Sequence, residues 1–271
     1  MSDNLYQSTT DRVKAWLDTD GTTLHIQFNN PERHNALSVD MWEAVNPLLN
    51  KAETDDNIRL VVFSGAGEKA FVSGADITQF EDMRAAKEAV ARYEKMAEEA
   101  LMGIYNFSKP TLACIRGYCI GGGVNVAMSC DIRIASDDSV FSIPAARLGL
   151  GYRYSALKNL VDLVGPAVAK DLFFTARRID AQEANRVGLI TRIAPSEGLN
   201  KLLDEYKTAL AANAPITVRA GKSIIREILK PSPEVDHDQC RVLIKNCFES
   251  EDYAEGRKAF MEKRKPVFRG K

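Results

Sequence analysis

The stretch of residues 109–135, KPTLACIRGYCIGGGVNVAMSCDIRIA, most constrains the fold of this chain. An apolar run follows Pro110, three glycines at 121–123 interrupt it, and a small-residue segment leads to a second apolar run behind Asp131. This order predicts a strand, a sharp glycine turn, the start of a helix and a further strand. Glycines let the backbone approach a ligand closely, and the first N–H groups of a helix have no partners inside it. Such a turn suits a phosphate or a forming oxyanion, although close packing of two elements would also call for glycine.

The composition is that of a globular protein with a substantial core, because 45% of the 271 residues are apolar and 27% are charged. A net charge of −1, from 36 basic and 37 acidic residues, predicts neither a nucleic-acid partner nor a membrane surface. No apolar run approaches the roughly 18 residues of a membrane span, and the polar N-terminus lacks a signal-peptide pattern. The 5 cysteines show no CxxC spacing. They indicate reduced thiols of a cytoplasmic protein without a metal site.

The first half of the chain alternates predicted strands and helices. Residues 22–28 alternate apolar and polar side chains, which predicts a half-buried strand with His25 on its polar face. Ser38 is a candidate N-cap for a following helix. A buried strand over 58–63, a turn over 64–71 and a long helix over 78–107 complete this half.

The second half is predicted to become entirely helical. Residues 141–154 form a loop, and short helices follow around 157–164, 167–174 and 181–187. No strand is expected beyond Pro195, where helices are predicted over 199–212, 217–229, 235–249 and through Phe260. We therefore divide the chain into a core of residues 1–200 and a helical region of residues 201–271.

Several motifs suggest chemistry but lack the required context. Residues 221–223, Gly-Lys-Ser, imitate the end of a P-loop, yet its first glycine would fall at Ile216. No GxSxG nucleophile elbow occurs. The three histidines, at 25, 34 and 237, are interpreted as structural or solvated residues and not as ligands.

A second small-residue turn, residues 73–77 with the sequence SGADI, follows an apolar run. An oxyanion hole needs two N–H donors fixed where negative charge develops, in a site that is poor in water. One amide from each glycine turn would meet that requirement.

Together the two turns resemble the crotonase family, the enoyl-CoA hydratase and isomerase superfamily. The resemblance rests on GADI and on KPxxAxIxGxxxGGGxxxAxxCDxRIA, and NPERHNALS, AQEANRVGLI and AFMEKRKPVF extend it over nearly the whole chain. It implies an α/β fold, a spiral of repeated ββα units with a C-terminal helical trimerisation region. It also implies CoA-thioester substrates, with no cofactor beyond the coenzyme A of the substrate.

The same resemblance implies roles for individual residues. The amides of Ala75 and Gly122 would hold the thioester carbonyl as it becomes an enolate. The residues implied to bind CoA are Arg33, Ala36, Ser73, Asp76, Ile77 and Lys263. For Asp76, capping of the following helix is an equal alternative.

Two departures from the family pattern bear on the reaction. Hydratases of the family carry two glutamates that activate water and supply the α-proton. Their positions correspond here to Asn125 and Ala145, and the loop over 142–154 contains no acid. An amide can position a water molecule but cannot take its proton. Hydration or isomerisation by the usual route is therefore not expected.

The same loop instead offers Tyr152 and Arg153, with Arg147 and Tyr154 nearby. A guanidinium and a phenol suit a substrate that bears its own carboxylate. The segment LGLGYRYSALKNL resembles the corresponding loop of methylmalonyl-CoA decarboxylases, although those have a histidine in place of Ala75 and an acid in place of Asn125. For each arginine, a solvent-facing side chain or a contact with a neighbouring subunit is an equal alternative.

The resulting hypothesis is lyase chemistry through an enolate held by Ala75 and Gly122. Tyr152 or Arg153 would orient a substrate carboxylate, as in decarboxylation of a malonyl-type thioester, and Asn125 would place a water or the protonating group. Two alternatives are an enoyl-CoA hydratase with acid–base groups from elsewhere in the chain, and a non-catalytic acyl-CoA binder. We expect a homotrimer or a dimer of trimers.

Overall fold

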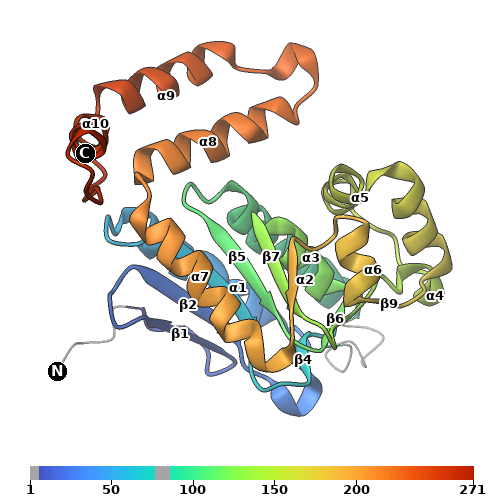
Figure 1. Ribbon diagram of the computed structural model, residues 1–271. Coiled ribbons are helices and arrows are strands. Elements are labelled where there is room, and N and C mark those ends of the chain that lie inside the picture. The colour runs from blue at the N-terminus through green and yellow to red at the C-terminus, as the bar shows by residue number, and fades with distance from the viewer. Residues whose placement is uncertain (1–5, 77–85) are drawn as a thin grey trace.

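The computed structural model describes residues 6–76 and 86–271 (Figure 1). The strands are β1 (Val13–Leu17), β2 (Thr23–Phe28), β3 (Leu60–Gly65), β4 (Ala70–Val72), β5 (Thr111–Ile115), β6 (Tyr118–Ile120), β7 (Ile132–Ser136), β8 (Val140–Ser142), β9 (Ile179–Asp180) and β10 (Arg192–Ala194). The α-helices are α1 (Val39–Thr54), α2 (Ala86–Asn106), α3 (Gly122–Ser129), α4 (Ala145–Leu148), α5 (Tyr154–Thr175), α6 (Ala181–Arg186), α7 (Leu199–Ala212), α8 (Pro215–Ile228), α9 (His237–Glu249) and α10 (Glu251–Met261). None of these helices is long and apolar enough to cross a membrane.

A ββα unit repeats along the chain, as β3–β4–α2, β5–β6–α3 and β7–β8–α4. The first strand of each unit joins a 6-stranded sheet of order β1-β2-β3-β5-β7-β10. The second strand joins a 4-stranded sheet of order β4-β6-β8-β9. Successive units pair in parallel in both sheets, so the chain advances by one strand per sheet with each turn. This arrangement confirms the predicted spiral of ββα units.

Helices cover both faces of the larger sheet. On one face, Leu199 and Leu202 of α7 pack against Leu60, Leu112 and Ile134 of the strands (Figure 1). On the other face, α1, α2 and α3 contribute to the main apolar core together with β2, β3 and β5. Burial of these apolar side chains, at roughly 25 cal/mol per Å², is the main force that holds the glycine turns in place.

The prediction that β2 is half-buried is wrong, because the strand is covered on both faces. Thr23 and His25, expected on a polar face, are 1% and 8% exposed. His25 stacks on Trp16 of β1, with ring centroids 5.0 Å apart, and its Nε2 lies 2.7 Å from Asp18 Oδ1. Burial lowers the pKa of His25 below its usual value, against the opposing effect of Asp18. The histidine is therefore structural, as interpreted.

Other local predictions need smaller corrections. Ser38 occupies the N-cap of α1, but its hydroxyl donates to Asp40 Oδ1 at 2.5 Å and caps no backbone N–H. The predicted turn over 64–71 contains the end of β3 and the first residues of β4. The two short helices predicted around 157–174 are parts of α5, separated by a break at Gly165, where φ is 74°.

The C-terminal helices extend away from the body of the molecule. Beyond Ala194 the described elements are helices, as predicted, and α8 and α9 lie side by side as an arm that ends in α10 (Figure 1). α9 buries none of its residues, and exposed apolar side chains occur along α9 and at the end of α10, namely Val242, Ile244, Phe248, Phe260 and Met261. Lys222 joins α8 to the body through an ion pair with Asp131 at 2.7 Å, so the P-loop-like triplet has a structural role.

Candidate active site

The turn after β4 presents the amide of Ala75 on the side facing away from Leu37. Ala75 forms a parallel bridge with Leu37, in which the Leu37 N–H donates to Gly74 O at 2.8 Å and the Asp76 N–H donates to Leu37 O at 2.9 Å. In this parallel bridge Leu37 makes both backbone hydrogen bonds with Gly74 and Asp76, the two neighbours of Ala75, and none with Ala75 itself. The Ala75 N–H therefore points to the opposite side.

The second turn places Gly122 at the start of α3. Gly121 has φ of 53°, a conformation that glycine adopts without strain, and its N–H donates to Ser142 O at 2.8 Å. Gly123 packs directly on β4, because a Cβ there would lie 2.3 Å from Val72 O. Gly122 is different, since a Cβ at this position would meet its nearest atom at 3.7 Å.

The two turns lie against each other and line one cavity. The Cα of Gly74 is 3.9 Å from the positions that Cβ atoms on Gly121 and Gly122 would take. The cavity encloses about 1130 Å³ including its open mouth, and Ser73, Gly74, Ala75, Gly121 and Gly122 are in its wall. Neither the Ala75 nor the Gly122 amide donates to an acceptor in the described part of the chain. An oxyanion hole requires two such free donors in one site, and the assignment of these amides to it stays a prediction.

Asn125 and Tyr152 form a hydrogen-bonded pair in the same wall. The Tyr152 hydroxyl donates to Asn125 Oδ1 at 2.7 Å, over 27 positions of sequence. Burial raises the pKa of Tyr152 far above its usual value, so the phenol stays neutral at physiological pH. Ala145, the first residue of α4, lies in the wall as well. The immediate surroundings of the two turns are therefore polar but uncharged.

Arg153 carries the one guanidinium among the described residues of the cavity wall, and two carboxylates hold it. Its Nη2 contacts the Glu94 carboxylate and donates to the Glu94 backbone oxygen at 2.7 Å. Its Nε lies 3.0 Å from Glu98 Oε2, and Glu98 also accepts a bond of 3.0 Å from the Ser155 hydroxyl. Arg153 is therefore not the unpaired cation that a substrate carboxylate would need, because α2 supplies its partners.

Glu94 belongs to the site although the sequence did not single it out. It is the only carboxylate among the described residues that line the cavity, and it lies on α2 beside Tyr93, Ala97 and Leu101 of the same wall. The spacing of these residues on one helix face was a usable signal, although α2 was predicted without a role. Arg147 and Tyr154, in contrast, lie outside the cavity lining.

The loop before α1 and the turn after β4 are held together by backbone bonds. Ser73 N–H donates to His34 O at 3.1 Å, and the Ser73 hydroxyl donates to Arg33 O at 3.3 Å. Arg33 Nη1 lies 3.2 Å from Asp76 Oδ1. Ala36 is buried, with 8% of its surface exposed, and its N–H donates to Arg33 O at 3.0 Å. Four of the predicted CoA-binding residues are thus brought together, and one of them, Ser73, lines the cavity.

Asn35 fixes this loop and was likewise not predicted. It is fully buried with φ of 56°, and its Nδ2 donates to Ala70 O at 2.7 Å and to Ala66 O at 3.0 Å. Its Oδ1 accepts from the Asn30 N–H at 2.9 Å. Asparagine suits a left-handed conformation, and here its amide joins the loop to the end of β3.

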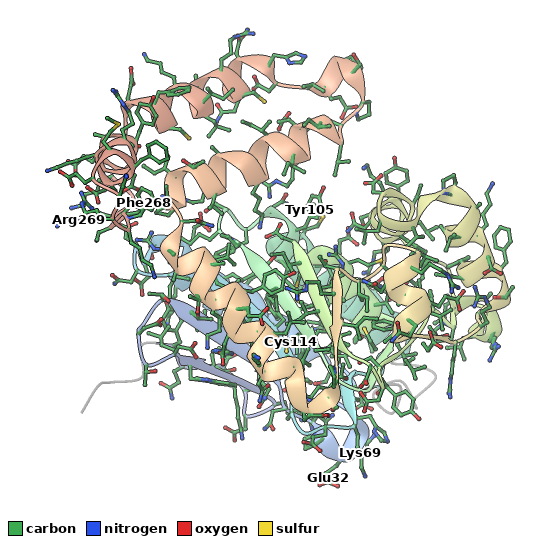
Figure 2. The ribbon with its side chains drawn as sticks, in the orientation of Figure 1. Glu32, Lys69, Tyr105, Cys114, Phe268 and Arg269 are labelled. Atoms are coloured by element: carbon green, nitrogen blue, oxygen red, sulfur yellow. The ribbon has the colours of Figure 1, made fainter. Side chains whose placement is uncertain are left out.

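Two predicted CoA contacts are not found in the cavity. Ile77 lies outside the described residues. Lys263 follows α10, which the arm carries to the other side of the molecule from α4 and α5 (Figure 1). Phe268 and Arg269, a few residues further on, also lie on that far side (Figure 2). The role of Lys263 in CoA binding therefore stays a prediction.

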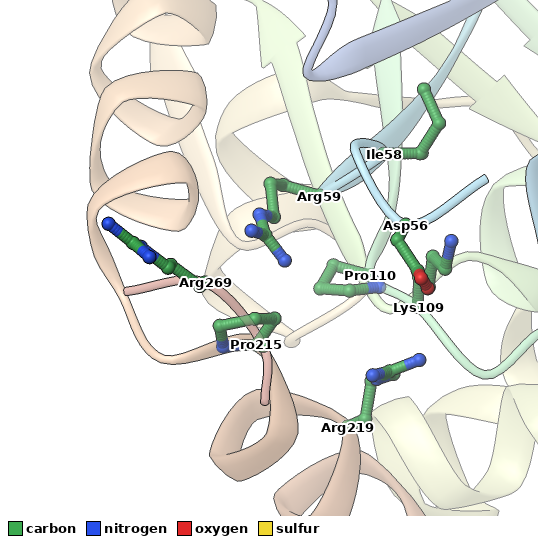
Figure 3. A pocket seen from close by; sticks show the side chains of 9 residues that line it. Asp56, Ile58, Arg59, Lys109, Pro110, Pro215, Arg219 and Arg269 are labelled. Carbon is green, nitrogen blue, oxygen red and sulfur yellow. The ribbon is translucent and has the colours of Figure 1, made fainter. Parts of the chain in front are cut away.

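Two other cavities lie away from the glycine turns. A small one of about 330 Å³ is lined by Arg59, Lys109 and Arg219 near the start of α8, with Asp56 among them (Figure 3). Lys109 there donates to the Ala52 and Asp55 carbonyls, each at 2.6 Å, which assigns it a structural role. A larger groove of about 1070 Å³ separates α8 from the body.

Comparison with known proteins identifies the family. The model of the enoyl-CoA hydratase/isomerase family matches residues 18–271. The chain is 32% identical to the short-chain-enoyl-CoA hydratase of Clostridium acetobutylicum, over 92% of this chain and 95% of that protein. Among solved structures, an enoyl-CoA hydratase/isomerase family protein from Hyphomonas neptunium superposes with a TM-score of 0.89 at 35% identity, covering 97% of this chain and 99% of that one. The enoyl-CoA hydratase of Bacillus anthracis gives 0.90 at 29% identity, covering 96% and 100%.

The chain belongs to the enoyl-CoA hydratase/isomerase family, the crotonase superfamily, and has its fold. It is an acyl-CoA-metabolising enzyme of that superfamily.

Proposed function

We propose that this enoyl-CoA hydratase/isomerase family member is a lyase that adds water to the double bond of a 2-enoyl-CoA thioester. One observation carries the proposal. The backbone N–H groups of Ala75 and Gly122 lie in the wall of one cavity and donate to no acceptor among the described residues. Water attack at Cβ moves electrons onto the thioester oxygen, and two fixed N–H donors stabilise that oxyanion. No cofactor is needed beyond the coenzyme A of the substrate.

Asn125 is assigned to placing the attacking water. Its Oδ1 is occupied by the Tyr152 hydroxyl, while its Nδ2 has no acceptor among the described residues and lies in the cavity wall. An amide N–H can hold a water by its oxygen without taking its proton. The related proteins named as hydratases support the same reaction for this chain.

Decarboxylation of a malonyl-type thioester is the second candidate, favoured by the neutral Tyr152–Asn125 pair. Loss of CO2 leaves the enolate directly and needs no base, so an uncharged wall is sufficient. Against it, the two carboxylates of Glu94 and Glu98 outweigh the single charge of Arg153, so this cluster would repel a substrate carboxylate. For this reason we rank it below hydration.

The CoA moiety is assigned to the loop of Arg33 and Ala36 and to the turn of Ser73 and Asp76. Hydrogen bonds and an ion pair hold these residues together, and Ser73 also lines the cavity. We further propose that residues 201–271 mediate assembly into a trimer or a dimer of trimers in the cytoplasm. The exposed apolar residues of α9 support the assembly. The free cysteines support the cytoplasmic location.

The test is to incubate the purified protein separately with crotonyl-CoA and methylmalonyl-CoA and to follow both by mass spectrometry. The proposal expects a gain of one water by crotonyl-CoA and no loss of CO2 from the other thioester. Loss of CO2 alone would replace it with the decarboxylase. Binding of both thioesters without conversion would instead favour a non-catalytic acyl-CoA binder. Sedimentation velocity on the same preparation tests the trimer.

A further inference from the structure

We propose that Glu94 of α2 is the acid–base residue of this site. It would replace the two glutamates that hydratases of the family carry at the positions of Asn125 and Ala145. The inference rests on the proposed function, because it names the group that moves the proton in the hydration step. It begins from a chemical requirement: a water molecule that adds to Cβ must lose a proton, and Cα must gain one.

The side chains nearest the glycine turns cannot meet that requirement. Asn125 does not take a proton, Tyr152 is neutral, and Ala145 has no functional group. Arg153 stays protonated at any physiological pH. Three described residues of the wall carry an ionisable oxygen: Glu94, Tyr93 and Tyr152. Burial raises the pKa of Tyr93 to about 12, which excludes that phenol as a base.

Arg153 holds the Glu94 carboxylate in place and is therefore a positioning residue. Its Nη2 bonds both the Glu94 carboxylate and the Glu94 backbone oxygen, and Glu98 holds the other edge of the guanidinium. This arrangement fixes the rotamer of a side chain that is otherwise 54% exposed. An acyl chain entering the cavity would displace water from Glu94 and strengthen its electrostatic interactions.

The proposed step balances with water alone. The water oxygen forms a bond to Cβ while Glu94 takes one of its protons, and the C=C electrons move to the thioester oxygen held by Ala75 and Gly122. Glu94 then returns the same proton to Cα as the enolate collapses. One carboxylate thus serves first as base and then as acid, and no other reactant is consumed.

The charged and titratable groups around Glu94 define what a pH profile would report. On α2 itself these are Glu98 and Tyr93. Tyr152 and Arg153 face it from the two positions before α5, and the Asp76 charge acts on the same cluster. Of these, Arg153 and the two tyrosines do not change charge between pH 5 and pH 9, by their chemistry and burial. A limb of the pH profile that Glu94→Gln removes and Glu99→Gln keeps would be assigned to Glu94.

The experiment compares Glu94→Gln with the matched control Glu99→Gln. Glu99 lies on the same helix, is 52% exposed and pairs with Lys95 across one turn, but it is not part of the cavity wall. Glu94→Gln should lower kcat for crotonyl-CoA by about 10²- to 10⁴-fold and remove the acidic limb of the pH profile. Its Kd for butyryl-CoA should change little. Glu99→Gln should keep kcat within about twofold.

A second measurement separates this inference from the proposed reaction. Butyryl-CoA in D2O should exchange an α-hydrogen for deuterium, because the same base can remove it and form the same enolate. If the wild type hydrates crotonyl-CoA and Glu94→Gln does so equally well, the role of Glu94 is overturned while the function stands. If the wild type exchanges but does not hydrate, and Glu94→Gln loses exchange, the function falls and the base stands. If the wild type shows neither hydration nor exchange, both the proposed function and the role of Glu94 are overturned.

Discussion

The site is built from two halves that differ in how the chain makes them. The oxyanion half consists of backbone, the amides of Ala75 and Gly122 on two short turns. The acid–base half consists of side chains, with Glu94 reaching Arg153 across 59 positions of sequence. A backbone half tolerates many side chains but no change in turn geometry, whereas a side-chain half depends on residue identity. This difference explains how a family fold can keep one half and rebuild the other.

The backbone half should be most sensitive at Gly123, which touches no substrate. Gly123→Ala places a Cβ 2.3 Å from Val72 O, so α3 must move away from β4 and carry the Gly122 amide with it. We expect a loss of about 1–3 kcal/mol in the free energy of unfolding. A displacement of about 1 Å at the hole should cost about 10²-fold in kcat. Urea unfolding and steady-state kinetics measure the two effects.

Gly221→Ala is the control for that substitution. No atom lies within 4 Å of a Cβ at this position in α8, and alanine favours a helix over glycine by up to about 1 kcal/mol. Unchanged or raised stability with full activity is the expected result. Full activity in Gly123→Ala would break the comparison, because the hole would then not depend on turn geometry.

The same contrast accounts for what the sequence could predict. Glycine turns are local, so the residue types at 73–76 and 121–123 indicate one candidate donor in each turn, and the family resemblance adds which amides these are. The ββα repeat was predicted from the family resemblance, and short strands such as β6 and β9 were not predicted one by one. Three or two residues carry too little periodicity to predict a strand.

Contacts between distant residues could not be predicted. Nothing near Arg153 in the sequence indicates that Glu94 and Glu98 neutralise it, since the pairing requires α2 to lie beside α5. His25 is a further case: it alternates with apolar residues as an exposed side chain would, but in the fold it is buried and stacks on Trp16 of β1. The position of Lys263 depends on the direction of the whole C-terminal arm.

The side-chain half should respond to Tyr152→Phe through Asn125. Loss of the hydroxyl leaves Asn125 Oδ1 without its 2.7 Å donor and frees the amide to rotate. An unmade buried hydrogen bond costs about 1–3 kcal/mol, which corresponds to roughly 5- to 150-fold in kcat. Because the two residues act as one unit, Asn125→Ala in the Tyr152→Phe background should add much less than it does alone. A double-mutant cycle in kcat/KM measures the coupling, and simple additivity would contradict it.

The smallest effect concerns the ionisation of Tyr152 itself. Burial raises its pKa far above the usual value, so the fold favours the neutral phenol. The stability linked to that group is fully present below pH 10, the unfolded value, and is lost only as the pH rises beyond it. Tyrosinate absorbance at 295 nm should therefore be equal in the wild type and in Tyr152→Phe up to about pH 10.5, while the variant loses less stability above that pH. A tyrosinate signal that disappears with the substitution below pH 10 would show a charged phenol, and with it a second candidate base beside Glu94.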